Sequence, residues 1–325
     1  MCVTGMHRSG TSLTAHALEL LGVSFGAGDR LMPPGPDNPA GYWENRDIKE
    51  LNDDLLARLG GSWDQPPVLD RGWEQEPSLD PLRGRASDVL DDAFGGTQPA
   101  RRLIGWKDPR LSLLLPFWRT VTPITTTILT VRDPAEVAAS LGARNGIEKP
   151  QAAVLWLRYL FAAVANDPGH LFVDHGEFFE DLPRTLAVLA AHLGLSPPDR
   201  DTTVDAHQLL DPSLRHHVAP AADPADDNPL CAMAAAVWNG GSLDLEAVPG
   251  VAAEAIRCGW LRPPIDGELL ARARAQAVEL RDRIRRRRRQ EIAAQAESNA
   301  GAEPHAQPPP TPVRGESSQL EDIDR

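Results

Sequence analysis

The residues best suited to chemistry lie in a glycine loop close to the amino terminus of this 325-residue chain. Residues 5–12 read GMHRSGTS, which matches the phosphate-binding pattern G-x-x-x-x-G-K-[ST] except that Thr11 stands where the pattern has lysine. The loop follows an apolar segment and opens a helical pattern, so its backbone N–H groups and a helix amino terminus point at one place. Such a loop can hold a 5'-phosphate group, and an ordinary glycine turn is the alternative interpretation.

The missing lysine argues against a nucleoside triphosphate as the ligand. In the usual pattern the lysine reaches the β- and γ-phosphates, and Thr11 cannot supply that charge. Arg8 places a cation inside the loop instead. A ligand with a phosphate and one further anionic group at its 5' end fits this arrangement better than ATP does.

Two later segments, GWKDPRLSLLL and TVRDPAEVAASL, each place a basic residue at the end of an apolar strand. Asp108 and Asp133 are predicted N-caps of the helices that follow, with proline at the first helical position. Because parallel α/β sheets bind ligands at the carboxyl ends of their strands, we expect Lys107 and Arg132 at the same edge as Arg8. The alternative for each cation is a salt bridge across that edge.

A second anion site is indicated by Ser140, which lies eight residues after Arg132 and two turns into the predicted helix. From there its hydroxyl can donate a hydrogen bond to an anion that Arg132 also binds. The pattern therefore favours two separate anion sites.

The elements that must position these residues alternate between strand and helix patterns. Apolar runs predict strands over residues 1–4, 103–106, 126–131 and 171–174. Apolar residues at helical spacing predict helices over 12–21, 46–59, 111–118, 135–141, 152–165 and 182–193. The expected fold class is α/β: a P-loop-like, three-layer α/β/α domain with a central parallel sheet.

The composition changes toward the carboxyl terminus. Residues 199–227 predict loops and short helices that cap the sheet. We predict an α/β domain over 1–265, an Arg-rich helix over 266–297 and a disordered tail over 298–325. The arginine run 285–289 is interpreted as a solvated helix end, with a contact for an acidic partner as the alternative.

The net charge of -13 argues against a protein that coats nucleic acid or an anionic membrane. Three widely spaced cysteines support neither a disulfide framework nor a zinc site, and no carboxylate cluster suggests a metal. No apolar run approaches the roughly 20 residues of a membrane span, and no signal-sequence pattern is present. We expect a cytoplasmic protein with no integral membrane segment, no nucleic-acid partner and no metal.

Two motifs together, HRSGTS and VRDPAEVAAS, lie about 120 residues apart. With them the chain resembles the sulfotransferases that use 3'-phosphoadenosine 5'-phosphosulfate (PAPS), in particular bacterial members with an R-S-G-T-[ST] loop, which are similar to tyrosylprotein and carbohydrate sulfotransferases. The resemblance covers roughly residues 1–195. It implies PAPS as donor and 3',5'-ADP as product.

The resemblance also implies roles for individual residues. The second motif would bind the 3'-phosphate through Arg132 and Ser140, and Lys107, in a KDP motif, would contact the transferring sulfuryl group. The first loop would bind the 5'-phosphosulfate through Arg8, Ser9, Gly10, Thr11 and Ser12.

A general base is also required, and some members of the family use a glutamate downstream of the loop. Glu44, in GYWEN, is the candidate here, with Asn45 as the predicted cap of the next helix. The alternative is that Glu44 is a first-turn acid that favours the helix dipole. Glu50, Asp54 and His7 are the other candidates for the base.

The aromatic residues divide into two groups. Relatives often have Y-E-D-L where this chain has HGEF at 175–178. A tyrosine contact with the adenine of PAPS can therefore not be assigned in this chain. On the acceptor side of the site we expect Trp43, Trp63 and Trp73. In the core we expect Trp106, Trp118 and Trp156.

The function expected from these observations is in-line transfer of a sulfuryl group from PAPS to a hydroxyl or amine of a sugar, glycolipid, peptide or small metabolite. The alternatives are a P-loop kinase or NTPase, disfavoured by Thr11, and a catalytically silent nucleotide-binding scaffold. Because the chain is acidic, we expect a neutral or weakly charged acceptor.

Overall fold

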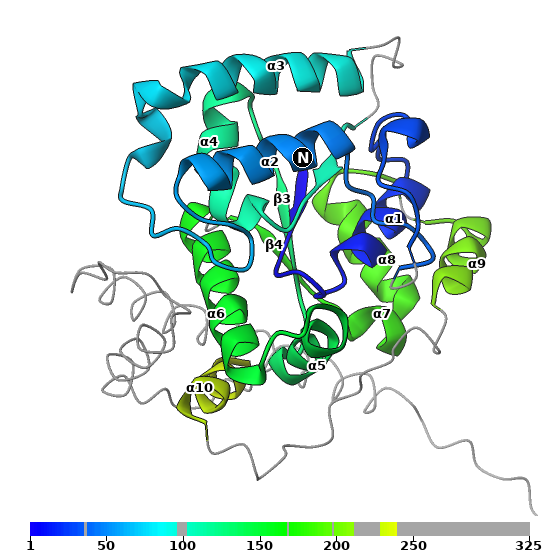
Figure 1. Cartoon of the computed structure of the whole chain (residues 1–325). Coiled ribbons are helices and arrows are strands. Elements are labelled where there is room, and N and C mark those ends of the chain that lie inside the picture. Colours follow the sequence, from blue (N-terminus) through cyan, green and yellow to red (C-terminus); the bar gives the residue numbers. More distant parts are fainter. Residues whose placement is uncertain (36–37, 96–102, 168, 197, 211–227, 239–325) are drawn as a thin grey trace, which may run out of the picture. The chain divides into compact units, whose positions relative to one another are not determined.

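Four parallel strands form the centre of the computed structural model, which describes residues 1–238 apart from 36–37, 96–102, 168, 197 and 211–227 (Figure 1). They lie in the order β2-β1-β3-β4, with β1 paired to both β2 and β3. Their bounds are β1 Cys2–Thr4, β2 Trp106–Lys107, β3 Thr127–Val131 and β4 Leu171–Asp174. All of β1 and β3 is buried, as expected for the inner strands of a parallel sheet covered on both faces.

Helices cover both faces of this sheet (Figure 1). The longer ones are α1 Thr11–Leu20, α2 Arg46–Arg58, α3 Asp80–Phe94, α4 Leu111–Val121, α5 Pro134–Asn145, α6 Lys149–Asn166, α8 Leu182–His192, α9 Arg200–Leu209 and α10 Pro229–Trp238. Shorter ones are η1 Gly28–Arg30, η2 Trp73–Gln75, η3 Pro77–Leu79 and α7 Glu177–Glu180.

The alternation of side chains along the strands divides the core into two clusters. Val3 and Ile128 pack with apolar residues of α1 and α8 on one face. Cys2 and Leu129, their neighbours in the chain, pack on the other face with residues of α2, α4 and α6. This arrangement confirms the predicted three-layer α/β/α class with a central parallel sheet.

Some predicted boundaries were wrong. The strand expected over 103–106 is displaced, since β2 consists of Trp106 and Lys107 and only Ile104 makes a further isolated bridge, to Ser24. The reason is that β2 is an edge strand that follows β1 for two residues only. Helix α3 was not predicted, although Leu82, Val89, Leu90 and Phe94 pack against the core at helical spacing beside the buried Ala86 and Ala93.

Only one of the two predicted aspartate caps is confirmed. The Asp133 carboxylate accepts a hydrogen bond from the backbone N–H of Ala135 and caps α5. The prediction for Asp108 was wrong, because α4 begins at Leu111 with Arg110 as its N-cap residue. Asp108 instead accepts the backbone N–H of Arg110 in a turn before the helix.

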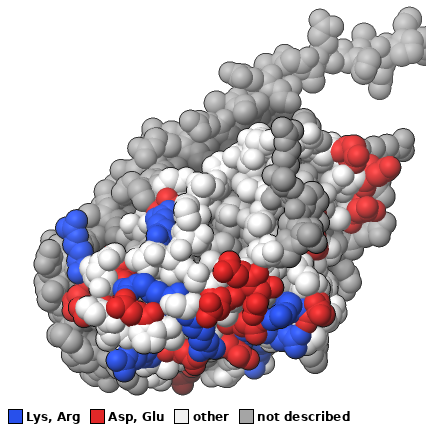
Figure 2. Space-filling model, turned by 90° about the horizontal axis from the view of Figure 1, so that it is seen from above, with Lys and Arg blue, Asp and Glu red and all other residues white. Residues whose placement is uncertain are grey.

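The predicted core tryptophans are confirmed, with Trp106, Trp118 and Trp156 all buried. None of the helices in the described part of the chain is long and apolar enough to span a lipid bilayer. The predicted helix over 266–297 and the tail over 298–325 lie outside the described residues, as does Cys258. Figure 2 shows acidic and basic side chains intermixed on the face seen from above.

The packing of α8 can be tested with two neighbouring residues. Leu189 is fully buried against the sheet, whereas Val188 is 43% exposed. We expect Leu189→Ala to lower the free energy of unfolding by about 2–5 kcal/mol, because it leaves a cavity. Val188→Ala should change it by less than about 0.5 kcal/mol. Urea unfolding measures both, and equal effects would contradict the assigned face of α8.

Candidate active site

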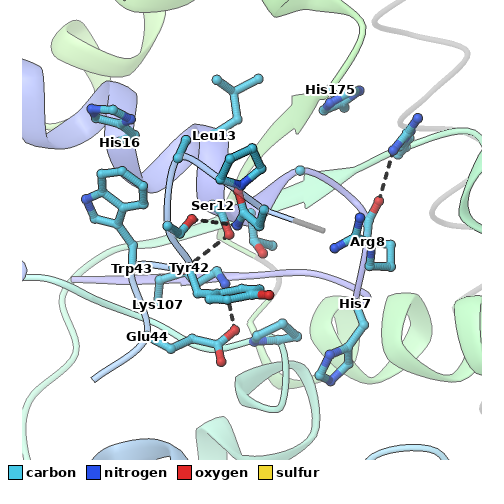
Figure 3. Close-up of a pocket in the computed structure, with 18 of the residues that line it drawn as sticks. His7, Arg8, Ser12, Leu13, His16, Tyr42, Trp43, Glu44, Lys107 and His175 are labelled. Atoms are coloured by element: carbon cyan, nitrogen blue, oxygen red, sulfur yellow. Dashed lines mark hydrogen bonds and ion pairs between the residues drawn. The ribbon is translucent and has the colours of Figure 1, made fainter. Parts of the chain in front are cut away.

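A cavity lies at the carboxyl ends of β1, β2 and β3, where ligands bind in parallel α/β folds (Figure 3). Its wall is built from the glycine loop, the segment before α2, the ends of β2 and β3, and the turn after β4. Seven of the nine residues predicted to form the site line it: Arg8, Gly10, Thr11, Ser12, Glu44, Lys107 and Arg132. Among the lining residues four are cationic, Arg8, Lys107, Arg132 and Arg144, and one is acidic, Glu44. The cavity therefore favours an anionic ligand.

The glycine loop presents the amino terminus of α1 to the cavity. Gly10 is the N-cap residue with φ 90°, and no side chain caps the first turn. A Cβ atom at this position would lie 2.2 Å from Cδ2 of His175, so the loop can pass this ring only as glycine. Arg8 also has a left-handed backbone, with φ 68°. The first-turn N–H groups and the helix dipole of α1 are therefore available to an anion in the cavity.

Lys107 and Glu44 form a buried ion pair in the cavity wall. Lys107 Nζ lies 2.7 Å from Glu44 Oε1, and their side chains are 2% and 12% exposed. Figure 3 shows the two side chains directed toward each other beside Tyr42. Lys107 lies at the end of β2, while Glu44 immediately precedes Asn45, whose side chain caps α2 as predicted. The alternative interpretation of Lys107 as a salt-bridge residue is therefore correct in part. Lys107 has a salt-bridge partner, but it also faces the cavity.

The second predicted anion site is directly connected to the glycine loop. Nε of Arg8 donates a hydrogen bond to Oγ of Ser140 at 2.9 Å, although 132 residues separate them in the sequence. Arg132 donates to Glu136 at 2.7 Å through Nε, and Nη1 lies 3.4 Å from the backbone oxygen of Arg8. Ser140 is buried and does not line the cavity, whereas Arg132 does. Trp156 fixes the backbone of Arg132 by donating to its carbonyl oxygen.

Two of the predicted loop residues have other contacts. Ser9 is buried outside the cavity lining, and its Oγ has no hydrogen-bond partner. Ser12 Oγ donates to the backbone oxygen of Tyr42 at 3.1 Å and so ties the loop to the segment before α2. That segment also carries Trp43, whose indole N–H donates to Glu19 and whose ring stacks on His16 at 4.0 Å.

His7 contributes a neutral imidazole to the cavity wall. Its ring packs 4.5 Å from Trp63 and 5.6 Å from Tyr159, measured between ring centroids. Nε2 is shielded from water and has no hydrogen-bond partner. Burial, and then the nearby cations of which Arg110 and Lys107 are the strongest, lower the pKa of His7 well below its ordinary value. The neutral His7 ring avoids charge repulsion with these cations.

Other predicted residues lie elsewhere. Asp54 is paired with Arg85 on the exposed side of α2, and Glu50 is exposed, so neither can serve as a base in this cavity. Trp43 lines the cavity, but Trp63 reaches it only through His7, and Trp73 packs against the core.

Some residues of the cavity wall were not predicted from the sequence. Arg144, in the last turn of α5, lies with its guanidinium 5.7 Å from the centroid of the Tyr42 ring. His175 and Phe179 also line the cavity. His175 directly follows β4, so its position at a strand end was a usable signal, whereas nothing local distinguishes Arg144. Within the described residues, no group of three or more His, Cys, Asp or Glu is arranged to hold a metal ion.

Comparisons with known proteins give matches only among solved structures. No family description and no curated protein matches the sequence. The sulfotransferase domain of the Synechococcus PCC 7002 olefin synthase has 15% identity and a TM-score of 0.43, covering 73% of this chain and 93% of that one. Sulfotransferase STF9 from Mycobacterium avium has 14% identity and a TM-score of 0.40, with coverages of 79% and 76%. The sulfotransferase domain from the curacin biosynthetic pathway has 13% identity and a TM-score of 0.40, with coverages of 81% and 98%. At these sequence identities and TM-scores, the chemistry of the cavity can be inferred only from its own residues.

The depressed pKa of His7 predicts a pH dependence of stability. In the unfolded chain the ring takes up a proton below about pH 6.5, whereas the folded chain keeps it neutral, so folding loses stability as the pH falls below that value. Between about pH 7.5 and about pH 5.5 we expect the wild type to lose up to about 1.4 kcal/mol more than His7→Gln. Urea unfolding measures this difference. His192→Gln, which removes an exposed histidine at the end of α8, is the control, and an equal response in all three proteins would refute the prediction.

Proposed function

We propose that the chain is a sulfotransferase that moves a sulfuryl group from PAPS to a hydroxyl or amine of a sugar, glycolipid, peptide or small metabolite, and releases 3',5'-ADP. One observation carries the proposal: the lysine-free glycine loop opens into the same cavity as Arg8, Lys107 and Arg132, and the cavity also holds a carboxylate, Glu44. A donor with separate 5' and 3' anionic groups suits this set of cations better than a triphosphate, for which the loop lacks its usual lysine.

The fit of such a donor rests on two parts of the cavity. The 5' end would be held by the α1 amino terminus and the loop residues Arg8 to Ser12, where Gly10 lets the loop pass the ring of His175. The 3'-phosphate is assigned to Arg132 and Ser140, of which Ser140 lies in α5 and contacts Arg8. PAPS supplies a sulfuryl group on a phosphate leaving group, and the chain's task is to place it and to stabilise charge.

Negative charge grows on the oxygen that bridges phosphorus and sulfur as the sulfur–oxygen bond breaks. Arg8 and Lys107 are the cations assigned to that charge, by analogy with phosphoryl transfer. The acceptor oxygen forms the new bond to sulfur and gives up its proton, and Glu44 is assigned as the group that accepts it. Because Lys107 contacts Oε1 of Glu44, the proton would be taken up at the carboxylate that the same lysine orients.

The nucleotide preference tests the proposal as a whole. At about 100 times its Kd, 3',5'-ADP should stabilise the folded chain by about 2.7 kcal/mol in a thermal-shift experiment, whereas ATP should have little effect. Stabilisation by ATP alone would favour a kinase or NTPase and overturn the proposal.

Arg132→Ala tests the 3'-phosphate assignment. Loss of a charge-assisted hydrogen bond should weaken 3',5'-ADP binding by about 10- to 100-fold, measured by calorimetry. Binding of 5'-AMP, which has no 3'-phosphate, should change little. If both ligands were weakened equally, Arg132 would be acting on the fold of the site and not on the 3'-phosphate.

Glu44→Gln tests the assignment of the base. We expect formation of 3',5'-ADP from PAPS to slow by about 100-fold or more, because the proton acceptor is lost. Affinity for 3',5'-ADP should be kept or increase, because Lys107 loses an internal counterion that competes with the ligand. Glu50→Gln, an exposed acid of α2, is the matched control. Full activity of Glu44→Gln would remove Glu44 as the base.

A further inference from the structure

A set of largely buried polar contacts lies outside the cavity lining and is not used by the proposed chemistry. It joins helix α2 to the segment that follows β2. Nδ2 of Asn52 donates to Oδ2 of Asp108 at 2.8 Å, and Nε of Arg110 donates to Oδ1 of Asp53 at 2.6 Å. We call these four residues the α2 clamp.

The clamp is almost completely satisfied by its own members. The Asp108 carboxylate accepts from Asn52, from the backbone N–H of Arg110 and from Nη1 of Arg110. Asn52 in turn accepts the indole N–H of Trp118 at 2.8 Å. Asn52, Asp108 and Arg110 are at most 4% exposed. Burial disfavours the charge of Arg110, but Asp108 and Asp53 outweigh it and raise the pKa of Arg110, so the guanidinium stays charged.

The clamp joins the same two chain segments that carry the proposed base and one proposed cation. Glu44 lies one residue before the cap of α2, and Asn52 and Asp53 lie in α2 itself. Lys107 ends β2, and Asp108 and Arg110 follow directly. Three side-by-side pairs therefore connect residues 44–53 with residues 107–110: Glu44 with Lys107, Asn52 with Asp108, and Asp53 with Arg110.

Pairing within the sheet fixes the backbone at this end of β2. The strand is two residues long and lies at the edge of the sheet, and the N–H of Asp108 donates to the carbonyl oxygen of Val3 just beyond it. The backbone does not fix the long Lys107 side chain, whose position depends on the side chains around it. Buried charged groups are also an expensive way to stabilise a fold, since apolar residues of similar volume often do as well or better. Buried charged groups instead fix the geometry of the side chains that they contact.

From these contacts we propose that Asn52, Asp53, Asp108 and Arg110 are positioning residues that set the separation of Glu44 and Lys107 at the transferring group. The inference rests on the proposed function. The members of the clamp touch neither donor nor acceptor, because none of them lines the cavity. They act through Lys107 and Glu44, and the anion-binding loop and Arg132 belong to other elements.

Asp53→Ala is the main test, because Asp53 is the most exposed member and its loss is the least disruptive to folding. We expect the rate of 3',5'-ADP formation from PAPS, with water or simple hydroxyl compounds as acceptor, to fall by about 10- to 100-fold, since small misplacements of reacting groups cost this much. The Kd for 3',5'-ADP should stay within about twofold of the wild-type value. Asp53→Asn should recover most of the rate, because its amide oxygen can still accept from Arg110.

Two control variants separate the clamp from its surroundings. Asp54→Ala removes the next acid in α2, whose partner is the exposed Arg85. Lys49→Gln removes the other ion-pair partner of Asp53, which is part of the helix surface. Both should keep the wild-type rate.

A double variant identifies the route of the effect. In a Glu44→Gln background, Asp53→Ala should cause a smaller loss than in the wild type, because the part of its effect that acts through Glu44 is already absent. The inference is overturned if Asp53→Ala keeps the wild-type rate, if it weakens 3',5'-ADP binding as much as it slows turnover, or if its loss simply adds to that of Glu44→Gln. If the wild type neither binds 3',5'-ADP nor consumes PAPS, the proposed function fails and the inference falls with it.

Discussion

The site depends on one constraint of the fold: in a parallel sheet all strands end at the same edge. The glycine loop after β1, Lys107 at the end of β2 and Arg132 just after β3 are therefore brought to one cavity, although they are far apart in the sequence. Helices that follow these strands start at the same edge, so their amino termini add partial positive charge to it. The order β2-β1-β3-β4 places the loop strand between the two strands that carry the other cations.

Net charge and local charge have opposite signs in this protein. The chain carries -13 overall, yet the ionisable groups that line the cavity are mostly cationic. The cavity therefore suits an anion through a small number of placed cations and backbone N–H groups, which act over short distances in a partly buried site. The acidic surroundings do not oppose this, because exposed charges more than about 8–10 Å away are largely screened at physiological salt.

The cations of the cavity also have internal partners. Lys107 contacts Glu44, Arg8 contacts Ser140, and Arg132 contacts Glu136. Such contacts hold long flexible side chains in defined conformations before a ligand arrives, which reduces the entropy lost on binding. Each also competes with the ligand for its cation. The balance between orientation and competition is set by contacts that cross between different elements. In the proposed function, the packing of α2 against the end of β2 therefore bears on the chemistry.

The sequence by itself determined the fold class, most of the elements and seven of the nine predicted site residues, which line the cavity as expected. Alternating apolar runs, the glycine loop and the repeated basic-Asp-Pro segments are local signals, and strand ends in a parallel fold share an edge whatever the details of packing. Tertiary structure alone decided which side chains meet: that Glu44 pairs with Lys107, that Arg8 reaches Ser140, that Arg144 and His175 join the wall, and that Asp108 serves a buried clamp and not a helix cap. These contacts join residues from 56 to more than 100 positions apart, so their geometry follows from how helices pack on the sheet, and no local pattern encodes it.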